Sequence, residues 1–257
     1  MNDCILELKN VSFSYNKGVE VLKDISFKLH KKEIVAVIGR NGVGKSSLFN
    51  IIAGFEKNII GDVFLNAKNI KRLKTKEKAK LLAYIPQFVG EIPSFYSVRD
   101  YIIEGRRPFS TLGFYNENDR KIVDEIIEKL ELNNIAEKNI KEISGGELQK
   151  CFLAQIMAQR PKVLLCDEPC SALDIQYQKT FFNGIYSLAS ELSTSVLISI
   201  HDINLAFRYC TKVIILHDKK IIFYGDVDKV PIKTLSLAFG VEIKKEKPLE
   251  WQRCVYY

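Results

Sequence analysis

A short apolar run that leads straight into a glycine-rich turn constrains this chain more than any other feature. The run IVAVIG at residues 34–39 consists of β-branched and small residues, which is typical of a buried parallel strand. The turn at residues 39–47 fits the pattern G-x-x-x-x-G-K-S. Four apolar residues then recur at the helical spacing i, i+3, i+4, i+7: Leu48, Ile51, Ile52 and Phe55. We therefore predict a strand, a loop and a helix in succession, with Gly54 near the end of the helix.

The residue types in this loop suit the binding of a nucleotide's phosphates. Glycines let successive backbone N–H groups point at phosphate oxygens, and the helix N-terminus adds partial positive charge. Lys45 can reach the β- and γ-phosphates, and the Ser46 hydroxyl can bind Mg²⁺. A chance glycine turn before a lysine is the alternative, but strand, loop and helix fall where phosphate binding needs them. We predict ATP contacts from Gly39, Arg40, Asn41, Gly42, Val43, Gly44, Lys45, Ser46 and Ser47.

A second apolar strand, VLLCDE at residues 163–168, ends in two acidic residues. Because the carboxyl ends of parallel strands meet at one edge of a sheet, Asp167 and Glu168 should lie beside the phosphate loop. Asp167 is placed to hold Mg²⁺, and Glu168 to orient and deprotonate the attacking water. For either residue alone, an acidic helix start after a strand is the alternative.

A second glycine-bearing helix start precedes this acidic strand. In ISGGELQK, residues 143–150, the backbone of Ser144, Gly145 and Gly146 offers N–H groups at a helix N-terminus, which predicts a second anion site. The alternative is a good helix cap and nothing more. One nucleotide needs one such terminus, so the second is predicted to serve the ATP of a neighbouring copy.

The remaining pattern predicts an α/β fold around a mostly parallel sheet. The first thirty residues alternate apolar and polar side chains, which predicts antiparallel strands. Residues 97–160 carry helical spacing and form a predicted helical insert. Apolar strand patterns resume at 163–168, 195–201, 213–217 and 221–225, with a helical stretch between the first two.

These motifs, in this order, resemble the ATP-binding cassette (ABC) ATPases over nearly the whole chain. GRNGVGKSS resembles the Walker A loop, ISGGELQK the signature motif, and LLCDEP the Walker B strand with Glu168 as catalytic base. The resemblance implies a P-loop NTPase fold with a mixed parallel core sheet, an N-terminal antiparallel β-subdomain and an inserted helical subdomain. We expect one domain over residues 1–257, with the Q-loop and helical insert at about 88–160.

The resemblance also implies roles for positions that no pattern reveals alone. Tyr15 resembles the aromatic residue that stacks on adenine, Gln87 the Q-loop glutamine near Mg²⁺, and His201 the histidine that contacts the γ-phosphate. The sequence SALD resembles the D-loop and adds Asp174 to the nucleotide-binding set. By themselves Tyr15, Gln87 and His201 read as a surface aromatic, a loop residue and a strand-end histidine. The full predicted set is catalytic Glu168, His201, Lys45 and Gln87, magnesium-binding Ser46, Gln87 and Asp167, and signature residues Ser144, Gly145, Gly146 and Glu147.

Two kinds of partner follow from the resemblance. The family implies a head-to-tail homodimer, with each ATP between one copy's Walker A loop and the other copy's Ser144–Gly146. The chain has no apolar run long enough to span a bilayer and no secretory signal, so we expect it at the cytoplasmic face of a membrane. There it would dock on integral membrane permease subunits through the segment Phe88 to Arg106, where Phe95 and Tyr96 suit either docking or core packing. A substrate-binding protein would act indirectly.

Phrases such as YSVRDYIIEGRRPF resemble the ATPases of importers for iron chelates, haem, cobalamin and molybdate, so we predict an iron-siderophore or related metal-chelate importer. A nucleic-acid repair ATPase and a soluble assembly factor are the alternatives. The net charge of +7 does not favour nucleic acid, because the one basic run, at 71–80, lacks interleaved aromatics. That run is predicted to be a solvated loop and helix start.

The six cysteines show no metal-binding spacing and are predicted to be buried reduced thiols. Cys166 and Cys170 flank the acidic pair at the predicted hydrolysis site. We therefore also predict that a thiol reagent inhibits the protein.

Overall fold

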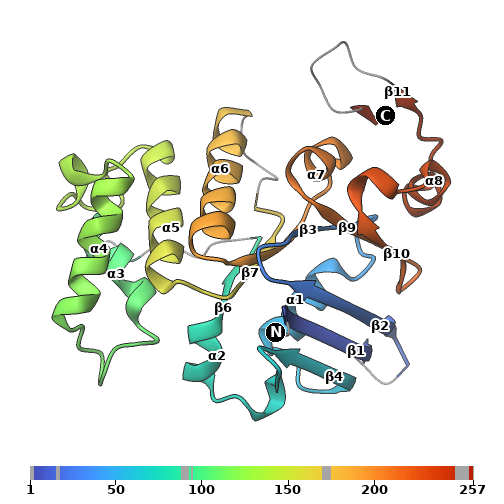
Figure 1. Cartoon of the computed structure of the whole chain (residues 1–257), viewed down its shortest axis with the longest axis horizontal. Helices are drawn as coiled ribbons and strands as arrows, with labels where there is room; N and C mark the ends of the chain where they lie inside the picture. The colour runs from blue at the N-terminus through green and yellow to red at the C-terminus, as the bar shows by residue number, and fades with distance from the viewer. Residues whose placement is uncertain are drawn as a thin grey trace.

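Two β-sheets form the frame of the molecule (Figure 1). The computed structural model describes residues 3–15, 18–87, 93, 95–169, 175–246 and 255–256. One sheet has six strands in the order β10-β9-β3-β8-β7-β6, and the other has four in the order β2-β1-β4-β5. This arrangement confirms the predicted mixed core sheet with a separate antiparallel sheet from the N-terminal part of the chain.

The central sheet is parallel except at one edge. Its strands are β3 (Ile34–Ile38), β6 (Leu82–Ile85), β7 (Val163–Asp167), β8 (Ser195–Ser199), β9 (Lys212–His217) and β10 (Lys220–Asp226). β10 pairs with β9 in the antiparallel sense, whereas the other neighbours are parallel. Every residue of β3, β7 and β8 is buried, as parallel strands covered on both faces should be.

The antiparallel sheet is built from β1 (Cys4–Ser14), β2 (Glu20–His30), β4 (Ile59–Leu65) and β5 (Lys68–Asn69). The alternation in the first thirty residues predicted β1 and β2 correctly. No prediction was made for β4 and β5, because β4 carries Gly61 and Asp62 inside a short apolar run.

The central sheet separates two hydrophobic cores, and β3 contributes to both. Val35 and Val37 pack in the core shared with α1 (Lys45–Ala53) and the antiparallel sheet. Ile34, Ala36 and Ile38 pack in the larger core on the opposite face, which is covered by the helices. The period-two alternation of a strand thus fixes α1, and the loop that precedes it, between the two sheets.

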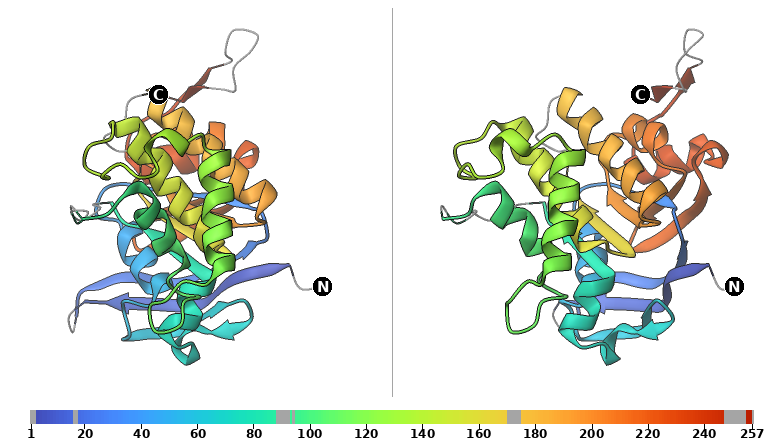
Figure 2. Two further views of the ribbon diagram at one scale, coloured as in Figure 1. Left: turned by 90° about the vertical axis from the view of Figure 1, so that its left-hand side faces the viewer. Right: turned by 60° about the vertical axis from the view of Figure 1, so that its left-hand side comes forward.

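The predicted helical insert lies between β6 and β7 in the chain and forms one end of the molecule, at the left in Figure 1. It contains α3 (Val98–Ile103), η2 (Glu104–Arg106), α4 (Glu117–Lys129), η3 (Asn133–Ile135) and α5 (Gly145–Gln159). The apolar stripe of α4 shows the predicted helical spacing, and its residues Ile122, Val123, Ile126 and Ile127 are buried in the larger core. Leu130, the next residue at this spacing, is the C-cap of α4 and is half-buried. In both views of Figure 2 the antiparallel sheet lies below these helices.

The remaining helices complete the fold. These are η1 (Ile70–Arg72), α2 (Thr75–Leu81), α6 (Ile175–Glu191), α7 (Ile203–Tyr209), η4 (Val227–Lys229) and α8 (Ile232–Phe239). A short hairpin, β11 (Lys245–Glu246) with β12 (Val255–Tyr256), ends the described chain. Within the described residues, no helix has both the length and the apolar content needed to cross a bilayer.

One helix boundary differs from the prediction. α1 ends at Ala53, and Gly54 caps it in the left-handed conformation at φ 75°. Phe55 therefore lies beyond the helix, where its side chain is 64% exposed. Assigning Phe55 to the helix was wrong because the glycine cap ends the helix before that position.

Candidate functional site

The glycine-rich loop joins β3 to α1. At its last glycine, Gly44, both the backbone conformation and the close packing disfavour any residue with a side chain. Gly44 is the N-cap of α1 at φ 110°, a region that favours glycine. A Cβ there would lie 2.9 Å from Leu22 Cδ2 and 3.2 Å from the Val21 carbonyl oxygen. Among the described residues no side chain caps α1, and its first turn carries no acidic residue. The N–H donors at this terminus therefore remain suited to an anionic ligand.

The loop forms one wall of a cavity of about 450 Å³, within the usual size range of small-molecule sites. The cavity is lined by Tyr15, Val21, Asn41, Gly42, Gly44, Lys45, Ser46, Ser47, Gln87, Glu168 and His201. Three residues predicted to contact the nucleotide, Gly39, Arg40 and Val43, do not line it. Residues from five separate parts of the chain, at 15–21, 41–47, 87, 168 and 201, thus converge on this space.

Lys45 is buried beneath the loop and is held by it. Its Nζ donates to the carbonyl oxygens of Gly39 at 3.0 Å and Arg40 at 3.3 Å, and lies 3.9 Å from Glu168 Oε1. Burial lowers the pKa of the Lys45 ammonium, although Glu168 and Asp167 oppose this effect. Gly39 and Arg40 therefore position the lysine with their backbone and do not face the cavity.

Glu168 is the point where the predicted catalytic residues meet. Gln87 Nε2 donates to Glu168 Oε2 at 2.8 Å, and His201 Nε2 lies 2.5 Å from Glu168 Oε1. With Lys45, the four residues predicted to be catalytic form one cluster. Glu168 itself has φ 51°, a conformation that costs a residue with a side chain about 1–3 kcal/mol.

A serine that the sequence reasoning missed connects the acidic pair. Asp167 is 2% exposed and accepts a hydrogen bond from Ser199 Oγ at 2.7 Å. The backbone N–H of Glu168 donates to the same Ser199 oxygen at 2.7 Å. The available signal was a hydroxyl residue at the end of a parallel strand, two positions before His201.

Tyr15 lies at the cavity, as its predicted role requires. Its hydroxyl is 3.0 Å from Ser47 Oγ, and its ring packs edge-on against Phe13 with centroids 4.7 Å apart. The side chain is 54% exposed, so one part of the ring remains open to a ligand. Contact with adenine stays a prediction.

The signature segment does not reach this cavity within one chain. Ser144 is the N-cap of α5, and its Oγ accepts from the Glu147 N–H at 3.3 Å. The Ser144 hydroxyl and N–H both donate to Glu147 Oε2, at 2.6 and 2.8 Å. These bonds with Ser144 lower the pKa of the Glu147 carboxyl. The Ser144 N–H, expected to be available to an anion, is thus occupied here, and neither Gly145 nor Gly146 lines the cavity.

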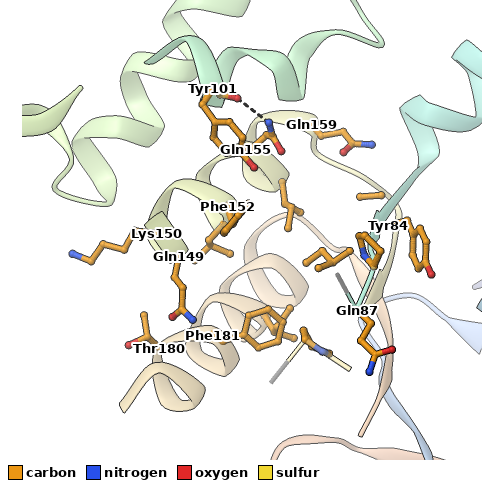
Figure 3. A pocket seen from close by; sticks show the side chains of 17 residues that line it. Tyr84, Gln87, Tyr101, Gln149, Lys150, Phe152, Gln155, Gln159, Thr180 and Phe181 are labelled. Atoms are coloured by element: carbon orange, nitrogen blue, oxygen red, sulfur yellow. Dashed lines mark hydrogen bonds between the residues drawn. The ribbon is translucent and has the colours of Figure 1, made fainter. Parts of the chain in front are cut away.

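A second cavity of about 320 Å³ lies between β6, α5 and α6 (Figure 3). Its walls are mainly apolar, with Phe152 and Phe181 among them. Gln87 lies at one edge, away from the hydrogen bond that Gln155 Nε2 donates to the Tyr101 carbonyl at 2.8 Å. Because Gln87 lines both cavities, it connects the loop site to the space beneath the helical insert.

The cysteine prediction is corrected in part. Cys166 lies inside β7 and is fully buried, so a reagent acting on the folded protein cannot reach it. Cys151 and Cys210 are buried as predicted, and burial raises the pKa of Cys151 to about 12. Cys4 is only half-buried, so for this residue the prediction of burial was wrong. Cys170 and Asp174, with the rest of the predicted D-loop, lie outside the described residues.

The residues at the cavity fit a magnesium ion that is bound together with phosphates. Mg²⁺ prefers oxygen ligands, and at the cavity Ser46 offers a hydroxyl and Gln87 an amide oxygen. Asp167, the third predicted ligand, is 2% exposed and does not line the cavity, although its neighbour Glu168 does. In the part of the chain that the structure describes, no group of three His, Cys, Asp or Glu residues could hold a metal by itself. The ion would therefore need oxygens from the nucleotide to complete its coordination.

Comparisons with known proteins agree with this geometry. The family model described as ABC transporter matches residues 22–171. The "Probable iron chelatin transport ATP-binding protein" of Helicobacter pylori is 37% identical over 84% of this chain and 85% of its own length. A "Putative ABC transporter ATP-binding protein" of Clostridium tetani is 34% identical over 87% of this chain, which spans about half (49%) of that relative.

The fold has solved counterparts. The structure called "An inward-facing conformation of a putative metal-chelate type ABC transporter" superposes with a TM-score of 0.82 at 24% identity, covering 99% of this chain and 97% of that one. At this identity the likeness supports the fold. The family model and the relatives make the assignment: the chain belongs to the ABC transporter family and is an ATPase coupled to transport.

Proposed function

We propose that this chain binds ATP with Mg²⁺ in the 450 Å³ cavity and hydrolyses it with Glu168 as general base. The observation that carries the proposal is the convergence of Gln87, His201 and Lys45 on the Glu168 carboxylate beside the uncapped start of α1. A carboxylate held by three groups is oriented before substrate arrives, which general-base catalysis requires.

Each residue has a defined task in this proposal. The first-turn N–H groups of α1 and the Lys45 ammonium bind the β- and γ-phosphates, where charge develops during phosphoryl transfer. Glu168 orients the attacking water and accepts its proton, and His201 contacts the γ-phosphate. When Mg²⁺ is bound by Ser46, Gln87 and Asp167, it neutralises charge on the β- and γ-oxygens.

A second copy of the chain completes the site in this proposal. The signature residues Ser144 to Glu147 lie away from the cavity of their own chain, although their helix start offers donors. A head-to-tail homodimer brings them to the γ-phosphate of the partner copy. Loss of that phosphate removes the contacts that favour the closed dimer.

The test of the hydrolytic site is Glu168→Gln. The amide of this variant keeps the shape of the carboxylate, so the protein should bind ATP. Its kcat should fall about 10²- to 10⁴-fold because the base is lost. Glu125→Gln, an exposed residue of α4, serves as the matched control and should hydrolyse ATP at the wild-type rate. Wild-type turnover by Glu168→Gln would reject Glu168 as the base.

The transport role that we propose is import of an iron-siderophore or related metal chelate through separate permease subunits. The Helicobacter pylori relative named for iron chelatin transport supports this cargo class. The docking surface would include Phe95, 76% exposed, and Tyr96, whose ring centroid lies 4.7 Å from that of Phe95. The apolar cavity beside Gln87 would relay docking to the ATP site.

Co-expression with candidate permease subunits tests this role. Phe95→Ser should reduce co-purification with the permease, whereas Phe55→Ser, which alters an exposed phenylalanine beyond α1, should not. Vesicles that contain the complex should accumulate a ferric siderophore when ATP is supplied. ATPase stimulation by nucleic acid, with no permease bound, would favour the repair ATPase instead.

A further inference from the structure

One hydroxyl lies between the two acidic residues of the site. β7 and β8 are parallel neighbours, and Asp167 and Ser199 form the last residue pair of their ladder. The Ser199 side chain is fully buried, so its hydrogen bonds must come from the protein around it. Both partners belong to the acidic pair: Asp167 Oδ1 at 2.7 Å and the Glu168 N–H at 2.7 Å.

The chemistry of the partners fixes the direction of both bonds. A backbone N–H can only donate, so the Ser199 oxygen accepts from Glu168. The single hydroxyl proton is then left for the Asp167 carboxylate, which fixes the orientation of that carboxylate. A hydroxyl that accepts one bond and donates the other couples the two residues, because moving either one disturbs the bond to the other.

We propose that Ser199 is a positioning residue for ATP hydrolysis, an inference that rests on the proposed function of Asp167 and Glu168. Its donated bond fixes the orientation of the carboxylate of Asp167, the proposed magnesium ligand. Its accepted bond fixes the backbone of Glu168, which keeps the left-handed conformation at φ 51° and extends its carboxylate to Gln87 and His201. Ser199 is fully buried and does not line the cavity, so it acts through these two residues.

The same strand supplies a matched control. Ser195 begins β8, is fully buried like Ser199, and its Oγ has no hydrogen-bond partner among the described residues. Ser199→Ala and Ser195→Ala each remove one buried hydroxyl from the same strand. A general effect of altering a buried serine in β8 would therefore appear in both variants, whereas loss of positioning would appear only at Ser199.

The experiment compares Ser199→Ala, Ser199→Thr and Ser195→Ala with wild type. Ser199→Ala should lower kcat about 10- to 100-fold, the usual cost of removing a partner that orients a metal ligand. The KM for ATP should change less than kcat, because the phosphate loop is untouched. Binding of a fluorescent non-hydrolysable ATP analogue should need about tenfold more Mg²⁺ for half-saturation, and should be unchanged in EDTA. Ser199→Thr keeps the hydroxyl and should restore kcat and the Mg²⁺ midpoint.

The outcomes separate this inference from the proposed function. If Glu168→Gln is inactive as expected, but Ser199→Ala matches wild type in kcat and Mg²⁺ midpoint, the positioning role is wrong while the hydrolytic site stands. An equal loss in Ser195→Ala would also overturn it. So would a Ser199→Thr protein that melts at the wild-type temperature yet remains as slow as Ser199→Ala.

Discussion

The two glycine-bearing helix N-termini of this chain, at α1 and α5, differ in how their backbone N–H groups are capped. α1 begins at Gly44 with no side-chain cap among the described residues and no acid in its first turn, and it opens into a cavity. α5 begins at Ser144 with a complete capping box to Glu147 and lies away from that cavity. The first terminus has donors ready for an anion, whereas at the second the N–H groups of Ser144 and Glu147 are already bonded within the capping box.

This difference explains why one chain can hold a nucleotide without closing on it. An incoming γ-phosphate at α5 must displace the bond between the Ser144 hydroxyl and Glu147 Oε2. A phosphate carries more charge than a carboxylate and accepts several N–H bonds at once, so the exchange is favourable when the partner copy presents ATP. In the proposed dimer, the α5 start would therefore bind only the phosphate that a partner copy presents, whereas the α1 start would bind phosphate in one chain alone.

Among the variants that compare the two helix starts, the largest effect is expected at the start of α1. Lys45→Met removes the ammonium beneath the loop and should reduce kcat/KM for ATP about 10²- to 10³-fold, as loss of a preorganised charge at the transferred group does. Steady-state ATPase rates and nucleotide affinity measure it. Lys150→Met, in α5, is the control and should leave the nucleotide affinity of the chain unchanged. Equal losses of nucleotide affinity in the two variants would contradict the proposed difference between the helix starts.

Ser144→Ala should affect hydrolysis and spare binding. The chain should retain its ATP affinity within about twofold, while kcat falls about 10- to 100-fold because the donor acts on the partner's nucleotide. Loss of the N-cap should also cost about 1 kcal/mol of stability, measured by thermal unfolding. A drop in ATP affinity as large as that of Lys45→Met would place Ser144 in its own chain's site and contradict the comparison.

Glu147→Gln should show a modest pH-dependent effect. The folded pKa of Glu147 is lowered below its ordinary value of 4.5, so ionised Glu147 stabilises the fold above that pH. As the pH falls below 4.5 and through the folded pKa, this contribution is lost. The melting temperature of wild type should exceed that of Glu147→Gln at neutral pH, and the gap should close in acid. A gap that widens in acid would exclude this cap as its source.

The smallest effect is expected at Cys166. The thiol is fully buried inside β7, so native alkylation should leave it unmodified and mass spectrometry of its peptide should show no adduct. The same reagent should label it in denaturant. Native labelling of Cys166 would mean that β7 opens far more readily than its buried position implies.

Sequence patterns predicted the elements whose residues show a clear hydrophobic period or a fixed motif. The all-buried strand β3, the stripe of α4 and the glycine loop are of this kind. α7, seven residues between β8 and β9, was missed because it is too short to show a helical period. Phe55 fitted the period of α1, but the cap at Gly54 ended the helix first.

The sequence predicted those site residues whose type is required by the chemistry. It did not reveal a residue whose role depends on its position in the folded sheet. Lys45 and Glu168 were found from motifs, while Gln87 and His201 came from the family resemblance. For Ser199 the sequence offered only a hydroxyl at the end of a strand, because its role arises from strand pairing across a separation of 32 residues from Asp167. A buried serine in an apolar strand looks the same whether it is paired, like Ser199, or without a partner, like Ser195.

The central claim is that the two helix starts, from different copies, hold one ATP between them. Sedimentation of Glu168→Gln with and without Mg²⁺ and ATP tests it most directly. The account predicts a dimer with ATP, a monomer without it, and a monomer that still binds ATP when Ser144→Arg is added. A Glu168→Gln protein that stays monomeric when saturated with ATP, or a double variant that still dimerises, would contradict the account.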